Sequence, residues 1–398
     1  MKQNSLLLAI LTGLFFPLFL SAQMIWIQAN ASAQWSARQK YAATVFDNKI
    51  WVLGGQEASR KNDVWYSTDG DSWIQATAAA QWSARRGHSA VIFDNKLWVI
   101  GGYDGARKND VWYSQDGVNW IQATANAAWS AREYHASVVY DNKIWVLAGY
   151  TGAFNNEVWY SSDGINWNSA TSSANWSARY WHSSVVFDNK IWVIAGSDGV
   201  LKNDLWYSTN GADWTCATAN ADWTARRTHA SVVFNDRIWV LGGLIYDGSR
   251  KNDVWYSLNG VDWFCADDTA DWSARYEHNS VVFDNKIWVM GGYDGSRKND
   301  VWYSPGLTGI EQDAENVRLQ RDNFRVFPNP AKSYFTIRLP QTADRTEVKI
   351  FDVTGKEVKR VWGLGIRDWQ ISLDGFKSGV YFIKIDDNAE LSKIVIAK

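Results

Sequence analysis

Apolar and polar residues alternate along most of this chain in blocks that recur at a fixed interval. Each block holds short apolar stretches separated by polar turns, and the motif Trp-Ser/Thr-Ala-Arg opens every block. The motif begins at Trp35, Trp82, Trp129, Trp176, Trp223 and Trp272. The first four steps are 47 residues long, and the last is 49 residues long because Leu244-Ile245 is inserted. Such self-similarity is typical of proteins built from stacked, equivalent units.

Each unit contains four stretches rich in Val, Ile, Trp and Tyr, which predict four β-strands. In the second unit, Asp94-Asn95 and Asp116-Gly117 have the composition of tight hairpin turns, so the strands form an antiparallel meander. The second strand is apolar at nearly every position, as at residues 97–100, and both of its faces must therefore be buried. Sheets that stack face to face around an axis meet this requirement. We predict an all-β fold, a six-bladed β-propeller over residues 23–304.

The two ends of the repeat array complement each other. The sixth unit stops at Tyr303-Ser304, before Pro305, and lacks a fourth strand. The segment Trp26-Ile27-Gln28-Ala29 matches Trp73-Ile74-Gln75-Ala76 in register. We therefore expect the N-terminal strand to complete the last blade and to close the ring without an open sheet edge.

The repeats resemble the kelch family. The resemblance rests on a Gly pair such as Gly101-Gly102, followed by the aromatic pair Trp112-Tyr113 and by Trp120. It implies a kelch-type propeller over all six units. The third and fourth units depart from the pattern with Ala148-Gly149 and Ala195-Gly196. Residues 114–120 also resemble the Asp-box hairpin of sialidase-type propellers, but the segment is one residue short, and we interpret it as a structural turn.

The chain ends predict export. Lys2, the apolar run of 15 residues from Leu6 to Leu20 and the small residues Ser21-Ala22 have the order of a signal peptide over residues 1–22. A retained N-terminal anchor is the alternative. No other stretch could span a membrane, so the mature chain should contain no transmembrane segment.

A polar, acidic linker is expected over residues 305–323, and alternating strands over residues 324–398 predict a small C-terminal β-sandwich. This region resembles the type A C-terminal sorting domain of type IX secretion. The matching segments are residues 326–330, 350–356, 373–374, 378–382 and 393–396. The resemblance implies contact with the type IX secretion machinery and export through the periplasm and outer membrane of a Gram-negative bacterium, to the cell surface or the medium. A plain adhesive β-sandwich is the alternative.

Charge and cysteine content exclude some classes of function. Once the expected signal peptide and its Lys2 are removed, 39 Lys and Arg residues stand against 42 Asp and Glu residues. This near-neutral balance gives no indication of nucleic-acid binding. Cys216 and Cys265 occupy equivalent positions on the outermost strands of neighbouring blades, too far apart for a disulfide. We expect two free thiols.

Positions that are constant in all six units are most simply explained as framework. Five histidines share one slot, which holds Tyr41 in the first unit; they are His88, His135, His182, His229 and His278. They come one per unit without paired ligand spacing, so we predict neither a metal site nor a cofactor. The same reasoning assigns the six motif arginines and the acidic slot that begins with Asp63 to the framework, and no catalytic residue is identified.

Two slots vary inside this constant frame. The first slot is the two residues after each motif arginine, which precede the innermost strand. The second slot is the residue after the Gly pair, at the end of the second strand. Because these two strands are antiparallel, both slots lie at the same end of the axis. In the kelch family these loops commonly form the ligand-binding face. The candidate ligand-binding residues are Lys40, Arg86, Tyr103, Glu133, Tyr134, Tyr150, Tyr180, Trp181, Arg227, Tyr276, Glu277 and Tyr293. Neutral drift of exposed loops is the alternative explanation.

These observations favour a secreted or cell-surface binding module for a glycan or a protein. Aromatic rings with polar tips suit both ligand classes, and the charges would orient the ligand. A carbohydrate-active enzyme is the first alternative, because some kelch propellers are oxidases or sugar-converting enzymes. A hydrolase needs two facing carboxylates, and Glu133 and Glu277 lie on opposite blades, which suggests too large a separation. A structural surface protein without a small ligand is the second alternative.

Overall fold

The computed structural model describes residues 23–308, 325–327, 334–338, 346–353, 356–363, 368–385 and 392–396. The expected signal peptide, residues 1–22, and residues 309–323 of the expected linker lie outside these ranges. Ala22–Thr308 forms one compact unit, and the C-terminal strands belong to a second unit. In the ranges that are described, no helix is long and apolar enough to cross a membrane.

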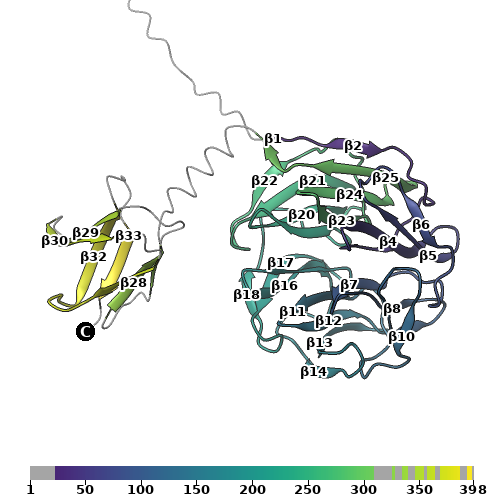
Figure 1. Cartoon of the computed structure of the whole chain (residues 1–398), viewed down its shortest axis with the longest axis horizontal. Coiled ribbons are helices and arrows are strands. Elements are labelled where there is room, and N and C mark those ends of the chain that lie inside the picture. Colours follow the sequence, from purple (N-terminus) through teal and green to yellow (C-terminus); the bar gives the residue numbers. More distant parts are fainter. Residues whose placement is uncertain are drawn as a thin grey trace, which may run out of the picture. The chain divides into compact units, whose positions relative to one another are not determined.

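Six four-stranded antiparallel sheets make up the first unit, and each sheet is one blade (Figure 1). The innermost strands contact one another in a closed ring and are β3 (Ala42–Phe46), β7 (Ser89–Phe93), β11 (Ala136–Tyr140), β15 (Ser183–Phe187), β19 (Ala230–Phe234) and β23 (Asn279–Phe283). The second strands are β4 (Lys49–Gln56), β8 (Lys96–Tyr103), β12 (Lys143–Tyr150), β16 (Lys190–Ser197), β20 (Arg237–Leu244) and β24 (Lys286–Tyr293). The third strands are β5 (Arg60–Ser67), β9 (Arg107–Ser114), β13 (Phe154–Ser161), β17 (Leu201–Ser208), β21 (Arg250–Ser257) and β25 (Arg297–Ser304). The outermost strands are β6 (Ile74–Thr77), β10 (Ile121–Thr124), β14 (Asn168–Thr171), β18 (Thr215–Thr218), β22 (Phe264–Asp267) and β2 (Ile27–Asn30). The predicted six-bladed propeller is confirmed.

The second strand of each blade carries the core, as its continuous apolar sequence predicts. In β8, the six residues between Lys96 and Tyr103 are all buried. Its side chains pack against both neighbouring blades: Leu97 and Val99 lie in one hydrophobic cluster, and Trp98 and Ile100 lie in another. The burial on both faces explains why this strand does not alternate apolar and polar residues.

The N-terminal strand closes the ring. β2 pairs with β25, with Ile27 opposite Tyr303 and Gln28 opposite Trp302, so the predicted closure is confirmed. A second pairing lies beside it, between β1 (Gln23–Met24) and β26 (Leu307–Thr308). The compact unit therefore runs to Thr308, a few residues into the segment expected to be linker.

The Asp-box-like hairpin serves as a turn, as predicted. Asp116 Oδ1 accepts hydrogen bonds from the backbone N–H groups of Val118 and Asn119, and Ser114 Oγ accepts one from Gly117. Gly117 has a φ of +74°, and a Cβ there would lie 2.1 Å from the ring of Trp51 on the preceding blade. The hairpin therefore fixes the spacing between blades.

Both cysteines are free and exposed, as expected, on β18 and β22. Partial burial raises the pKa of both thiols.

The second unit is the predicted small β-sandwich. One sheet pairs β27 (Arg325–Phe327), β28 (Tyr334–Arg338) and β31 (Asp368–Ser372). The other sheet pairs β30 (Glu357–Gly363), β29 (Thr346–Asp352), β32 (Gly379–Ile385) and β33 (Ser392–Ile396). Val348 and Ile350 from β29 share a buried cluster with Ile371 from β31, so the core lies between the two sheets.

Candidate functional site

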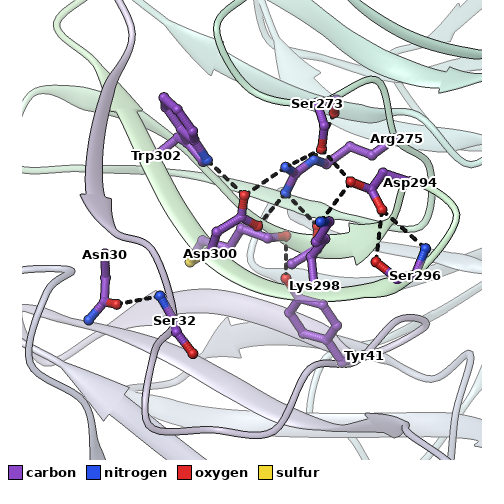
Figure 2. A network of polar contacts seen from close by, with 12 residues as sticks. Asn30, Ser32, Tyr41, Ser273, Arg275, Asp294, Ser296, Lys298, Asp300 and Trp302 are labelled. Carbon is purple, nitrogen blue, oxygen red and sulfur yellow. Dashed lines mark hydrogen bonds and ion pairs between the residues drawn. The ribbon is translucent and has the colours of Figure 1, made fainter.

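The repeated arginine and acidic residue form a buried ion pair within each blade. All six arginines are fully buried, and their guanidinium groups lie 2.6 to 2.7 Å from the acidic partner. In the sixth blade, Arg275 donates to both carboxylate oxygens of Asp300 and to the carbonyl of Gly291. Asp300 also accepts from the indole of Trp302 (Figure 2).

The backbone of the same arginine pairs with the preceding blade. Arg275 N donates to Lys251 O, and Arg275 O accepts from Gly243 N. Each arginine therefore joins two blades, its main chain on one and its side chain on the next. This six-fold role explains the constancy of the slot without any ligand.

The histidine slot is also part of the packing between blades. The imidazole of His88 packs beside Trp82, and its Nε2 lies 3.1 Å from the carbonyl oxygen of Leu53 on the preceding blade. Burial lowers the pKa of His88 to about 3, so this ring is neutral. Tyr41, which takes the slot in the first blade, donates its hydroxyl to Met290 O. In the described part of the chain, no group of three or more His, Cys, Asp or Glu side chains is placed to hold a metal ion.

The second residue of each variable pair belongs to a ring around the axis. The ring residues are Lys40, Gly87, Tyr134, Trp181, Thr228 and Glu277. Their φ angles lie between +53° and +60°. Each N–H from Gly87 to Glu277 donates to the carbonyl of the ring residue on the preceding blade, at 2.8 to 3.3 Å. The backbone thus encircles the axis in the left-handed conformation.

This conformation is unfavourable for most of the residues that adopt it. Glycine accepts it freely, whereas a residue with a Cβ pays about 1–2 kcal/mol. A β-branched residue such as Thr228 is an outlier there. Gly87 is the only ring member that the backbone itself favours. Five blades nevertheless place larger side chains on the ring.

The first residue of each variable pair is bonded to the second slot of its own blade. Backbone bridges join Arg86 to Tyr103, Glu133 to Tyr150 and Tyr276 to Tyr293. Tyr180 and Arg227 are joined in the same way to Ser197 and Leu244. The structure therefore brings the two slots together at one end of the axis. We call the ring residues and these bridged pairs the axial mouth.

Aromatic side chains cover one sector of the axial mouth. Tyr180 stacks on Trp181 with ring centroids 3.8 Å apart, and Phe154 stacks on Tyr180 at 5.0 Å. Tyr134 meets Trp181 edge-on at 5.3 Å. The ring of Tyr134 also lies over Gly87 of the neighbouring blade, where an added Cβ would be only 3.0 Å from it. The missing side chain at Gly87 leaves room for Tyr134.

Cations and carboxylates occupy the rest of the axial mouth. Lys40 Nζ lies 3.7 Å from Glu277 Oε1, and Glu133 lies 3.8 Å from Arg86 Nε and 3.7 Å from Arg107 Nε. These are ion pairs beyond hydrogen-bond length. The guanidinium of Arg227 lies over Trp181 at 4.2 Å, and that of Arg107 lies over Tyr150 at 4.4 Å.

Burial shifts the titration of the two carboxyls. Desolvation raises the pKa of Glu277 to about 7, although Lys40, Arg86 and Arg227 oppose the shift. Desolvation also raises the pKa of Glu133, against Arg86, Arg107 and Lys40. Although Glu133 and Glu277 belong to the third and sixth blades, the same two cations, Lys40 and Arg86, act on both.

The first residue of the third strand contributes to the axial mouth and was missed in the sequence. Arg60 lies over Tyr103 and Arg250 over Tyr293, each reaching the next blade. In the third blade this position is Phe154. The variation was visible, because Phe154 and Leu201 interrupt a run of arginines. No local pattern shows its role, because the side chain acts on the next blade.

Comparison with known proteins supports the assignment of both units. Residues 18–196 match the family model described as the KLHDC2/KLHL20/DRC7 Kelch-repeats domain, and residues 274–303 match the Kelch motif. Residues 325–397 match the secretion system C-terminal sorting domain. The solved structure of YjhT is similar with a TM-score of 0.58 at 14% identity, over 69% of this chain and 96% of that chain, a likeness of fold. No curated protein matches the chain.

Proposed function

Since the chain is a kelch-repeat propeller with a type IX secretion C-terminal sorting domain, destined for the cell surface or for secretion, we propose that it is a binding module. Its ligand, a glycan or a protein, binds at the axial mouth. A signal peptide over residues 1–22 delivers the chain to the periplasm, and the sorting domain carries it across the outer membrane of a Gram-negative cell.

The strained ring is the observation that carries this proposal. A position free to drift would accumulate glycine or asparagine at φ near +55°, because other residues lower stability there. The ring instead holds Lys40, Tyr134, Trp181, Thr228 and Glu277. Backbone strain of this kind clusters at active sites and ligand-binding sites. Five different, mostly large side chains at one mouth therefore favour selection for binding over drift.

The chemistry of the axial mouth suits a ligand with both apolar and polar groups. Tyr134, Tyr180 and Trp181 offer large rings that order at low entropic cost. Lys40 and Arg86 place cations beside the buried carboxylates of Glu277 and Glu133. Such a mixture orients a ligand as well as binding it.

A glycan-array screen of the purified protein, with the Trp181→Ala variant beside it, tests the proposal. Tyr334→Ala is the matched control, because Tyr334 is an exposed aromatic residue in the sorting domain. Selective binding that is lost in Trp181→Ala and retained in Tyr334→Ala supports a site at the axial mouth. Binding that Trp181→Ala leaves unchanged would place the site elsewhere. No binding to any glycan would favour a protein partner or a structural role.

An enzymatic role is a second candidate, because the two buried carboxylates share Lys40 and Arg86. Acid–base catalysis on sugars uses a pair of carboxyl groups, one of which is a general acid with a raised pKa. Turnover of a bound glycan that disappears in Glu133→Gln or Glu277→Gln would support this candidate. Binding of a glycan without turnover would support a binding module and not an enzyme.

A further inference from the structure

The two carboxylates of the axial mouth are buried without full hydrogen bonding. The side chains of Glu133 and Glu277 are each only 6% exposed. Within the described residues, Oε2 of each is buried and has no hydrogen-bond partner. Leaving a buried acceptor without a donor costs about 1–3 kcal/mol. These two oxygens therefore favour a ligand that donates hydrogen bonds.

Donors without partners lie at the same mouth. The buried Nε atoms of Arg86 and Arg107 and the indole Nε1 of Trp181 have no acceptor among the described residues. Other buried indoles in the same condition, such as those of Trp35 and Trp82, recur in every blade and belong to the framework. The unpartnered groups of Glu133, Glu277, Arg86 and Trp181 occur once each, only where the blades differ.

The surrounding charges select the kind of donor. Lys40, Arg86 and Arg107 lie within 3.8 Å of the carboxylates, so a ligand ammonium group would be repelled by three cations. The donors to the carboxylates must therefore be uncharged. A hydroxyl group donates one hydrogen bond and accepts others, so neighbouring hydroxyls can serve Glu133 Oε2 and Arg86 Nε together.

We infer that the axial mouth binds a neutral, hydroxyl-rich saccharide whose hydroxyls donate to Glu133 and Glu277. This inference rests on the proposed function and narrows its two ligand classes to one. The stack of Phe154, Tyr180 and Trp181 then flanks the sugar with apolar surface. The sugar hydroxyls bond to the carboxylates and accept from Arg86 and Arg107.

The test titrates the purified full-length mature protein with neutral sugars at millimolar concentration by calorimetry. The probes are glucose, galactose, mannose and N-acetylglucosamine, with glucuronate as a charged comparison. Glu133→Gln and Glu277→Gln are the variants, and Glu57→Gln is the control, because Glu57 is a more exposed carboxylate at the same end of the propeller, paired with Lys61. Melting curves of all variants establish that each is folded.

We expect a neutral sugar to bind and its affinity to fall about ten- to hundredfold in each site variant, with little change in Glu57→Gln. Deoxy analogues of that sugar identify the hydroxyl involved. The analogue that lacks it should lose the same factor with the unaltered protein and nothing further with the matching glutamine variant. That lack of additivity is the signature of a direct contact.

Other outcomes separate the inference from the proposed function. Failure of all neutral sugars to bind would overturn the inference, as would sugar binding that Trp181→Ala abolishes and both glutamine variants leave unchanged. In the second case the axial mouth remains a binding site. Sugar binding that neither Trp181→Ala nor the glutamine variants affect would overturn both. Tighter binding of glucuronate than of every neutral sugar would overturn the neutral class.

Discussion

The carboxylate of Glu277 lies 3.7 Å from the ammonium group of Lys40, across the junction where the sixth blade meets the first. Both residues belong to the left-handed ring, with φ angles of 54° and 59°. The contact therefore joins the last repeat to the first one at the axis. It couples closure of the propeller to the charge at the centre of the candidate site.

The first prediction concerns the pH dependence of stability. Folding raises the pKa of Glu277 from 4.5 to about 7, because burial disfavours the carboxylate more than Lys40, Arg86 and Arg227 stabilise it. Protonation of Glu277 therefore stabilises the folded state fully below the unfolded pKa of 4.5. This stabilisation is lost as the pH rises from there through the folded pKa of about 7. Glu277→Gln mimics the protonated form. We expect the variant to be more stable than the parent by about 1–3 kcal/mol at alkaline pH.

Thermal melts of parent and variant across this range check the prediction. The difference in unfolding free energy should approach zero below pH 4.5, grow between pH 4.5 and about 7, and level off above 7. Tyr134 and Tyr276 also face Glu277, but burial raises the pKa of both, so they stay neutral here. A difference that is constant with pH would contradict the shifted titration.

Much of the fold could be predicted because local sequence patterns determine it. The apolar second strand, the hairpin turns and the register of Trp26 against Trp73 each depend on a few neighbouring residues. The six repeats made those patterns unmistakable. The closure through β2 followed from the same register.

The candidate site could be predicted only in outline. The variable slots after the motif arginine and after the Gly pair were predicted correctly as neighbours. The two residues that follow each motif arginine, however, were treated as equivalent. In the structure, Glu133 pairs with its own blade, whereas Tyr134 enters the ring and leans over Gly87. This division arises from the circular arrangement of blades, and no local sequence pattern encodes it. Arg107 was missed for the same reason, since it acts on the next blade.

The second prediction concerns the glycine of the Asp-box-like hairpin. Gly117→Ala would place a Cβ 2.1 Å from the Trp51 ring at a φ of +74°. We expect a loss of about 2–4 kcal/mol, from overpacking together with backbone strain. The control is Gly248→Ala, which has a φ of +82° and nothing within 4 Å of the added Cβ. Chemical denaturation should show a loss of only about 1–2 kcal/mol for the control. Equal losses of stability in Gly117→Ala and Gly248→Ala would mean that the Trp51 ring moves aside without cost.

The third prediction concerns the two blades that depart from the Gly pair. Ala148 has a φ of +55°, and His182, the histidine of the next blade, has no partner for Nε2 among the described residues. His88, which follows Gly54, reaches the Leu53 carbonyl instead. Ala148→Gly should therefore relieve strain and let His182 reach the Leu147 carbonyl.

We expect Ala148→Gly to stabilise the protein by about 1–2 kcal/mol. The reverse substitution in a neighbouring blade, Gly101→Ala, should destabilise it by a similar amount, because its Cβ would lie 3.0 Å from His135. Urea denaturation of both variants measures the two changes. Opposite signs would support the shared mechanism, and a destabilised Ala148→Gly would refute it.

The last prediction concerns the N-terminal closure. Trp26 is 5% exposed and packs edge-on against Trp272 at 5.8 Å, whereas its neighbour Ile25 is 51% exposed. Trp26→Ala should cost about 3–5 kcal/mol, and Ile25→Ala should cost little. Removal of residues 23–34 should lower the melting temperature more than either substitution, because β25 would lose its outer partner and the sixth blade would keep an open edge. A truncated protein that melted like the parent would show that the ring closes without β2. Because Lys40 and Glu277 meet at that same junction, a truncation that loosened the closure should also weaken any ligand bound at the axial mouth.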